Sequence, residues 1–144
     1  MTEHRLGVIM NGVTGRMGTN QHLIRSILAI IEQGGVSLNN GDTVMPDPIL
    51  VGRNAAKIEA LAAVHGVTRW TTDLDSAIRN SDDRVFFDSA STNLRASLIR
   101  QAIEAGKDIY CEKPSSGTLE DAIDIYQRAE TAGVKHGVVQ DKIF

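Results

Sequence analysis

The first residues that could bind a ligand are three glycines, Gly12, Gly15 and Gly18, in the spacing G-x-x-G-x-x-G. The apolar run 6–10 before them is typical of a buried strand, and residues 17–31 after them have helical apolar spacing. Glycines let a backbone approach a phosphate, and a helix N-terminus offers unpaired N–H groups and a positive dipole end. Although this spacing is one residue longer than the usual G-x-G-x-x-G, the strand–turn–helix setting predicts a pyrophosphate site rather than a plain turn.

Two arginines lie where a bound nucleotide would need a cation. Arg16 stands at the start of the predicted helix, against its dipole, where it could reach a phosphate or stack on adenine. Arg53 follows Gly52 at the end of a strand, where an NAD-binding sheet normally carries Asp or Glu for the ribose 2′-OH. This position has no carboxylate that would repel a 2′-phosphate, and the planar guanidinium of Arg53 can bind one. The pattern therefore favours NADP over NAD. The alternative is that both arginines only face water.

Lys113 is the candidate for acid–base chemistry. It follows a predicted strand, residues 107–111, and is held by the next residue, Pro114. An ammonium at the mouth of a buried sheet can donate to a substrate oxygen or move a proton, whereas the alternative is an ordinary surface turn. Cys111 is expected to be a small core residue. The four histidines show no metal-ligand spacing, so no metal site is predicted.

The elements that must position these residues alternate between strand and helix. Strands are predicted at 6–10, 48–51, 67–70, 85–87, 107–111 and 134–140, and helices at 16–33, 55–64, 73–78, 93–105 and 118–132. Asp73 and Thr118 are the expected N-caps of two of these helices. Residues 36–47 are expected to be an exposed loop insertion, or else a functional flap. The alternation predicts an α/β fold, a doubly wound parallel sheet of Rossmann type.

Composition narrows the class of protein further. The 144 residues make one ordinary domain, and the 42% hydrophobic content can supply its core. A net charge of −3 without a basic cluster argues against nucleic acid and anionic membrane as partners. The longest apolar run is too short to span a bilayer, no signal peptide is visible, and a single cysteine suits a reducing compartment. The sequence therefore predicts a soluble, cytoplasmic protein.

The stretch EAGKDIYCEKP, residues 104–114, resembles a signature of the Gfo/Idh/MocA family of oxidoreductases, named after glucose–fructose oxidoreductase, inositol dehydrogenase and a rhizopine catabolism protein. With the glycine loop, residues 50–67 and the helix 118–132, the resemblance covers nearly the whole chain. It implies that Lys113 lies beside the nicotinamide, polarises the substrate oxygen and relays its proton during hydride transfer. It also implies a Lys-Pro bond that is often cis.

The motifs and the resemblance together give the expected site residues. The expected catalytic residue is Lys113. The stretch 88–93 at the end of the fourth predicted strand contains small polar residues that could let a dinucleotide pass close to the backbone. For Asn93 itself, the role of a helix N-cap is favoured. The expected cofactor-binding residues are Gly12, Thr14, Gly15, Arg16, Met17, Arg53, Asn54, Ser89, Ala90, Ser91, Asn93, Glu112, Lys113 and Pro114.

Three departures from the family pattern stand out. The glycine loop GVTGRMG is similar to that of dihydrodipicolinate reductases. The usual Thr-Pro…His after the fourth predicted strand becomes Ala90-Ser91…Arg95, which changes the expected contacts near the nicotinamide. The acidic ribose position is Gly52, which again favours NADP, with NAD as the alternative.

The resemblance implies that residues 1–144 are the dinucleotide-binding domain of an NAD(P)-dependent oxidoreductase acting on a sugar, cyclitol or related polyol. Family members carry a C-terminal domain that supplies most substrate contacts, the acid–base partner and usually the oligomer interface. That domain is absent from this chain, so we expect a fragment that binds cofactor but catalyses little alone, from a homo-oligomeric protein. The alternatives are a non-catalytic redox-sensor module and, from the glycine loop only, a dihydrodipicolinate reductase-like enzyme.

Overall fold

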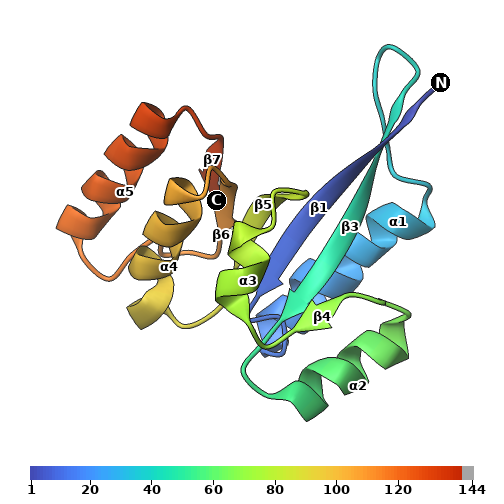
Figure 1. The fold of residues 1–144 in the computed structure, drawn as a ribbon, viewed down its shortest axis with the longest axis horizontal. Coiled ribbons are helices and arrows are strands. Elements are labelled where there is room, and N and C mark those ends of the chain that lie inside the picture. Colours follow the sequence, from blue (N-terminus) through green and yellow to red (C-terminus); the bar gives the residue numbers. More distant parts are fainter. Residues whose placement is uncertain (141–144) are drawn as a thin grey trace.

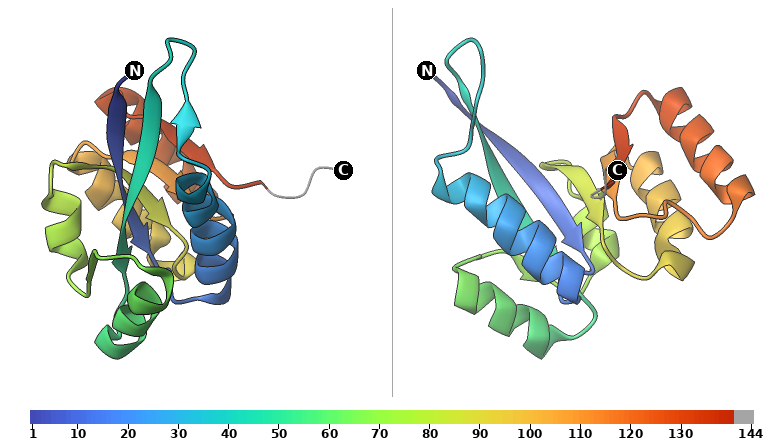
Figure 2. Two further views of the ribbon diagram at one scale, coloured as in Figure 1. Left: turned by 90° about the vertical axis from the view of Figure 1, so that its right-hand side faces the viewer. Right: turned by 180° about the vertical axis from the view of Figure 1, so that it is seen from behind.

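The computed structural model describes residues 1–140, which form one seven-stranded sheet with helices against both faces (Figures 1 and 2). The strands are β1 (Glu3–Asn11), β2 (Val36–Ser37), β3 (Thr43–Val51), β4 (Trp70–Thr71), β5 (Asp83–Asp88), β6 (Asp108–Cys111) and β7 (His136–Val138). The helices are η1 (Met17–Leu28), α1 (Ala29–Glu32), α2 (Ala55–His65), α3 (Leu74–Arg79), α4 (Thr92–Glu104) and α5 (Leu119–Ala132). The predicted Rossmann-type α/β sheet is confirmed.

The strand order places β1 near the centre of the sheet. The order is β2-β3-β1-β5-β6-β7, and β4 also pairs with β3. Every pair is parallel except β2 with β3. The chain runs outward from β1 to β3 and β4, returns to the other side of β1 with β5, and continues to β6 and β7. The strand order therefore reverses between the carboxyl ends of β1 and β5, which is where such sheets bind ligands.

Successive side chains of the central strands pack on opposite faces of the sheet, as the two-residue period of a strand requires. Ile9 and Phe86 belong to the core under α3, α4 and α5. Val8, Met10 and Phe87 belong to the core under η1 and α2. The predictions that residues 6–10 and 85–87 are buried strands are thus confirmed, and both strands are anchored from two sides.

The first half of β3 corrects the prediction that residues 36–47 are a loop. This strand begins at Thr43 and stays paired with β1 over its whole length, and β2 forms a short antiparallel pair with its start. Leu50 N donates to Arg69 O of the outer neighbour at 3.0 Å, so the even-numbered amides of β3 point away from β1. Pro46 and Pro48 lie in the same register and place their missing N–H groups at that outer edge, where a strand tolerates proline.

The helices agree with the predicted ones to within a few residues. Asp73 Oδ1 accepts from Ser76 N at 2.9 Å and Thr118 Oγ1 accepts from Asp121 N at 3.2 Å, so both predicted N-caps are confirmed. The proposed capping role of Asn93 is wrong, because the N-cap position of α4 is Ser91. The first predicted helix is wound as a π-helix over η1 before it continues as α1. Within residues 1–140, no helix has both the length and the apolar character needed to cross a membrane.

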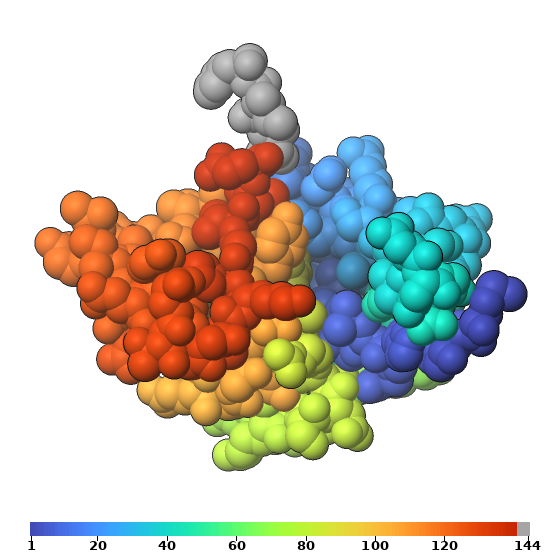
Figure 3. Space-filling view, turned by 90° about the horizontal axis from the view of Figure 1, so that it is seen from above, coloured from blue at the N-terminus to red at the C-terminus, as the bar shows by residue number. Residues whose placement is uncertain are grey.

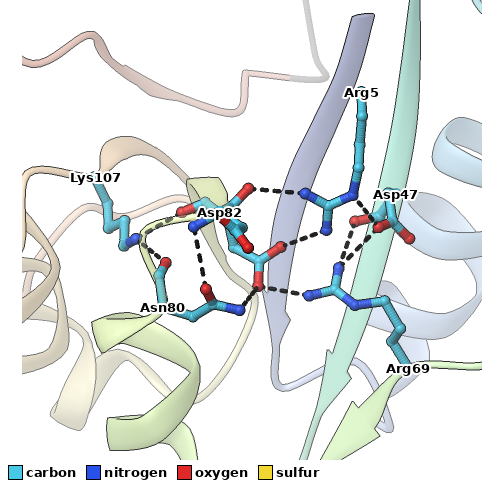
Figure 4. A network of polar contacts seen from close by, with 7 residues as sticks. Arg5, Asp47, Arg69, Asn80, Asp82 and Lys107 are labelled. Atoms are coloured by element: carbon cyan, nitrogen blue, oxygen red, sulfur yellow. Dashed lines mark hydrogen bonds and ion pairs between the residues drawn. The ribbon is translucent and has the colours of Figure 1, made fainter.

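A closed network of charges joins the strands at their amino-terminal edge (Figure 4). The Asp83 carboxylate is fully buried and accepts from Arg69 at 2.6 Å, Arg5 at 3.1 Å and Asn80 at 3.2 Å. Lys107 Nζ donates to the Asp83 carbonyl at 2.6 Å. Burial lowers the pKa of Lys107, while the Asp83 charge opposes that effect.

Gly7 makes this network possible from the neighbouring strand. A Cβ at this position would overlap the Asp83 carboxylate, and it would lie 2.7 Å from the Asp82 carbonyl oxygen. The register of β1 with β5 also shifts between Gly7 and Val8. The glycine in β1 therefore provides the space for the buried carboxylate of β5.

Candidate functional site

The opposite, carboxyl-terminal edge of the sheet gathers the loops that follow β1, β3 and β5 around a cavity of about 510 Å³. Its lining residues are Asn11, Gly12, Thr14, Gly15, Val51, Gly52, Arg53, Thr72, Leu74, Ser89, Ala90, Ser91, Leu94 and Leu98. Of the predicted residues, those that meet at this cavity are Gly12, Thr14, Gly15, Arg53, Ser89, Ala90 and Ser91. The cavity lies at the point where the strand order reverses.

The glycine loop is shaped by close backbone contacts. Gly12 has a φ of +74°, and a Cβ there would lie 2.5 Å from Ala90 N. A Cβ at Gly18 would lie 2.7 Å from Gly12 O and 2.8 Å from Ser89 Oγ. A Cβ at Gly15 would meet only Gly12 O, at 3.4 Å. Gly12 and Gly18 therefore let the loop pack on the segment after β5, whereas Gly15 keeps space open in front of the helix.

These residues fit a dinucleotide pyrophosphate. The helix η1 begins at Met17, between the second and third glycines of the loop. It has no acidic residue in its first turn, and no side chain is hydrogen-bonded to its N-terminus as a cap. Its first N–H groups and the open space at Gly15 form the kind of cradle that binds phosphate. Arg16, at the N-cap position, and Met17 are exposed at this start of the helix.

The rim of the cavity at the end of β3 is cationic. Arg53 is exposed there, and no acidic residue is found among the described residues that line the cavity. Asn54 is oriented differently from the prediction, because its side chain accepts from Lys57 N at 3.0 Å and caps α2. Asn93 is exposed in the first turn of α4. Neither asparagine is among the lining residues of this cavity.

The apolar wall of the cavity was missed by the sequence reasoning. Leu94 and Leu98 of α4 line it together with Leu74 and Thr72. In the sequence, Leu94 and Leu98 have the i, i+4 spacing of a helix face that packs in a core, and the side chain of Leu94 is instead 51% exposed. That exposure on an otherwise regular helix is visible only in the structure.

Two buried polar residues hold the ends of β1 and β5 together. Ser89 N and Ser89 Oγ both donate to Asn11 O at 3.0 Å. Asn11 Nδ2 donates to Asp88 Oδ1 at 2.7 Å, and both of these side chains are buried. This pairing fixes the two strand ends that flank the cavity.

The guanidinium of Arg95 extends the same polar cluster to the lysine loop. Arg95 is 2% exposed, and its Nε donates to Asp88 Oδ2 at 2.8 Å. Its two terminal nitrogens donate to Ala90 O and Pro114 O, each at 2.6 Å. Asn11, Asp88 and Arg95 were not among the predicted site residues, although the sequence singled out Arg95 as a departure from the family pattern.

The loop after β6 carries Lys113, which is exposed, and the Lys113–Pro114 peptide is cis, as the resemblance implied. Glu112 is buried and interacts with His22 Nε2 through Oε1 at 2.6 Å, while its Oε2 accepts from Lys113 N at 3.1 Å. His22 also contacts the ring of Phe87, with 4.6 Å between centroids. His22 was missed as a site residue; its position four residues after Gly18 was the only signal available.

Cys111 has the core role that the sequence predicted. Its side chain is 1% exposed and packs with the core under α4. Burial raises the pKa of the Cys111 thiol to about 11. The thiol is therefore protonated at neutral pH and unsuited to nucleophilic chemistry.

A second cavity, of about 480 Å³, lies on the η1 face of the sheet and reaches Glu112 and His22. Seen from the amino-terminal edge, the surface is hollowed between the blue segment that contains η1 and the red segment that contains β7 (Figure 3).

Within residues 1–140, no group of three or more His, Cys, Asp or Glu side chains is arranged to hold a metal ion.

Comparison with known proteins agrees with this geometry. The family model described as "Oxidoreductase family, NAD-binding Rossmann fold" matches residues 48–140. D-xylose dehydrogenase of Paenarthrobacter nicotinovorans is 50% identical over 137 residues, which cover 95% of this chain and 35% of that protein. 1,5-anhydro-D-fructose reductase of Ensifer adhaerens is 29% identical over 104 residues, 72% of this chain and 30% of that protein.

A solved structure, levoglucosan dehydrogenase in complex with NADH and levoglucosan, superimposes with a TM-score of 0.78 at 26% identity and covers 94% of this chain and 35% of the other. The chain thus spans about a third of the length of the relatives it matches. The family match extends over more than half of the chain and includes the ends of β3, β5 and β6. The chain belongs to the Gfo/Idh/MocA family of oxidoreductases and has the NAD-binding Rossmann fold of that family.

Proposed function

We propose that this chain is the cofactor-binding domain of an NADP-dependent oxidoreductase that acts on a sugar, cyclitol or related polyol. The observation that carries the proposal is the cavity at the reversal point of the strand order, with the open glycine loop on one side and Arg53 at a rim without acidic residues. The substrate class is supported by the relatives, which are named as enzymes for D-xylose, 1,5-anhydro-D-fructose and levoglucosan.

Each group of the chain has a distinct role in this proposal. The N-terminus of η1 and Gly15 bind the pyrophosphate, and the Arg53 guanidinium binds the 2′-phosphate. A nicotinamide cofactor bound there supplies the hydride chemistry. Lys113 donates a hydrogen bond to the substrate oxygen and holds the proton that this oxygen loses or gains. Glu112 accepts from the amide of Lys113 and so fixes the backbone from which the lysine extends.

The cofactor assignment is tested by titrating the chain with NADPH and with NADH and measuring binding by calorimetry. We expect NADPH to bind at least about tenfold more tightly, because a charge-assisted contact to the 2′-phosphate contributes about 1.5–3 kcal/mol. Arg53→Ala removes that preference and leaves NADH binding unchanged. Lys57→Ala is the matched control, because Lys57 is an exposed cation of α2 whose side chain is outside this cavity.

The outcomes separate the parts of the proposal. Equal binding of both cofactors by the unmodified chain contradicts the 2′-phosphate assignment and leaves a domain for NAD. Binding of neither contradicts the cofactor-domain proposal for the chain on its own.

The catalytic assignment is tested in the full-length protein. From the family resemblance, we propose that this protein is a homo-oligomer. Lys113→Ala abolishes turnover of the polyol and spares cofactor binding, whereas a redox-sensor module would be little affected by this change. Residues 1–144 alone are expected to bind cofactor with little turnover. Substrate-dependent reduction of NADP at a robust rate by this chain alone would contradict that expectation.

A further inference from the structure

Arg95 is a buried cation whose hydrogen bonds connect two loops of the candidate site. Its three donor positions reach the Asp88 carboxylate, the Ala90 carbonyl and the Pro114 carbonyl at 2.6–2.8 Å. Ala90 lines the cavity at the reversal point, and Pro114 directly follows Lys113. One rigid group therefore spans the distance between the cavity wall and the lysine loop.

The planar shape of the guanidinium gives this link a fixed geometry. The group is planar, and its N–H donors are fixed in a fork, so contacts at three sides of the plane fix the relative positions of the three acceptors. Asp88 neutralises the buried charge and is itself held by Asn11 Nδ2 at 2.7 Å. The resulting chain of contacts runs from the end of β1 through the end of β5 to the loop after β6.

A second arginine of the same helix shows what an ordinary structural contact looks like here. Arg100, five residues later in α4, is partly buried and pairs with Asp121 and Asp124 of α5. Its partners are surface carboxylates of α5, and none of them belongs to a loop of the candidate site. Arg95 differs because two of its three partners are backbone carbonyls of loops at the candidate site.

We propose that Arg95 is a positioning residue that sets the lysine loop, and with it Lys113, relative to the cofactor cavity. This inference rests on the proposed function and deepens it. In the proposed function the adenosine half is held by the glycine loop and Arg53, which follow β1 and β3 and make no hydrogen bond to Arg95. The partners of Arg95 are the last residue of β5, Ala90 in the loop after β5, and Pro114 in the loop after β6. Loss of the fork therefore weakens binding of the complete dinucleotide and leaves binding of its adenosine half unchanged.

The first test does not involve the cofactor. Hydrogen exchange of backbone amides is compared between the full chain and its Arg95→Lys variant, which keeps the buried positive charge but loses the fork. We expect exchange at Lys113, Ser115 and Ser116 to become at least about tenfold faster, with unchanged exchange in β1 and β5. Arg100→Lys is the matched control and leaves these three amides unchanged. Unchanged exchange of the lysine loop in Arg95→Lys overturns the positioning role.

The second test measures the division between the two halves of the site. The same variants are titrated with NADPH and with 2′,5′-ADP, which lacks the nicotinamide half. We expect Arg95→Lys to lose at least about tenfold in NADPH affinity and to bind 2′,5′-ADP like the unmodified chain. Equal losses for both ligands, or no loss for either, overturn the proposal. If the unmodified chain binds neither ligand, the proposed function fails, and the exchange experiment still decides whether Arg95 positions the loop.

A second variant keeps both tests possible if Arg95→Lys does not fold. Asp88→Asn combined with Arg95→Gln removes both buried charges together, so no unpaired charge is left in the interior. We expect this double variant to show the same faster exchange at the lysine loop and the same selective loss of NADPH affinity.

Discussion

The two edges of the sheet use the same kinds of charged residue in opposite ways. At the amino-terminal edge, Asp83 is fully buried and its carboxylate is surrounded by Arg5, Arg69 and Asn80 (Figure 4). At the carboxyl-terminal edge, Arg53 is exposed at the rim of the cavity, and Lys113 is exposed on the loop after β6. A charge whose hydrogen-bonding capacity is met within the protein stabilises the fold, whereas an exposed charge at the rim of a cavity is available to a ligand.

The use of glycine also differs between the two edges. The amino-terminal network fills its own space, since even a Cβ at Gly7 would overlap the Asp83 carboxylate. At the other edge Gly15 keeps space open, because a Cβ there would meet only Gly12 O at 3.4 Å. Glycine thus serves packing at one edge and access at the other.

The largest expected effect comes from breaking the amino-terminal network. Asp83→Ala removes the fully buried one of the two carboxylates that Arg5 and Arg69 share, and leaves both guanidinium groups with Asp47 alone. We expect a loss of about 1.5–3 kcal/mol in the free energy of unfolding, because the hydrogen bonds to a buried charged group are lost. Urea denaturation measures this loss. Asp82→Ala, at the exposed neighbour, is the control and is expected to change stability by less than about 0.5 kcal/mol. Similar losses for both variants would show that the buried carboxylate is not the centre of the network.

The complementary change at the carboxyl-terminal edge is Gly15→Ala. We expect cofactor affinity to fall at least about tenfold because the new methyl group occupies the phosphate space, whereas the free energy of unfolding stays within about 0.5 kcal/mol. Gly117→Ala is the control, since a Cβ at Gly117 meets nothing within 4 Å. Calorimetry and urea denaturation of both variants give the two quantities. A large loss of stability in Gly15→Ala would place this glycine with the packing residues instead.

Cys111 is an exception to the contrast between the two edges, because it lies at the carboxyl-terminal edge but is packed like a residue of the core. With the pKa raised to about 11 by burial, only about one thiol in a thousand is ionised at pH 8. We expect labelling by iodoacetamide at pH 8 to be far slower in the folded chain than in urea, and to speed up about tenfold per pH unit below that pKa. Rapid stoichiometric labelling of the folded chain at pH 8 would contradict the burial.

The smallest effect is expected from charges that belong to neither edge. Arg100 lowers the pKa of both Asp121 and Asp124 through hydrogen bonds between α4 and α5. Because the folded-state pKa is lowered, the stabilisation is present above the unfolded-state pKa of about 4 and is lost as the pH falls through the folded value. The urea midpoint of Arg100→Gln should therefore differ slightly from that of the unmodified chain at pH 7, and the two should converge in acid. A difference that grows in acid would contradict this sign.

The sequence by itself determined the order of elements and the local motifs. Periodic apolar spacing predicted the central strands and the helices, because burial on one or both faces leaves a repeat that needs no knowledge of distant residues. The glycine loop, Arg53 and the lysine loop were predicted for the same reason, since each is a short segment at the end of one strand. The beginning of β3 was missed, because Pro46 and Pro48 are compatible with a strand only at an unpaired edge.

Only the tertiary structure decided which of these residues meet. His22 and Glu112 are 90 residues apart in the chain, and Arg5 and Asp83 are 78 apart, so no local pattern connects them. Arg95 is a helix residue by its sequence, and only the parallel arrangement of β5 and β6 brings its guanidinium to Ala90 and Pro114. Burial and hydrogen bonding between distant segments give a charged residue its role, and both exist only once the chain has folded.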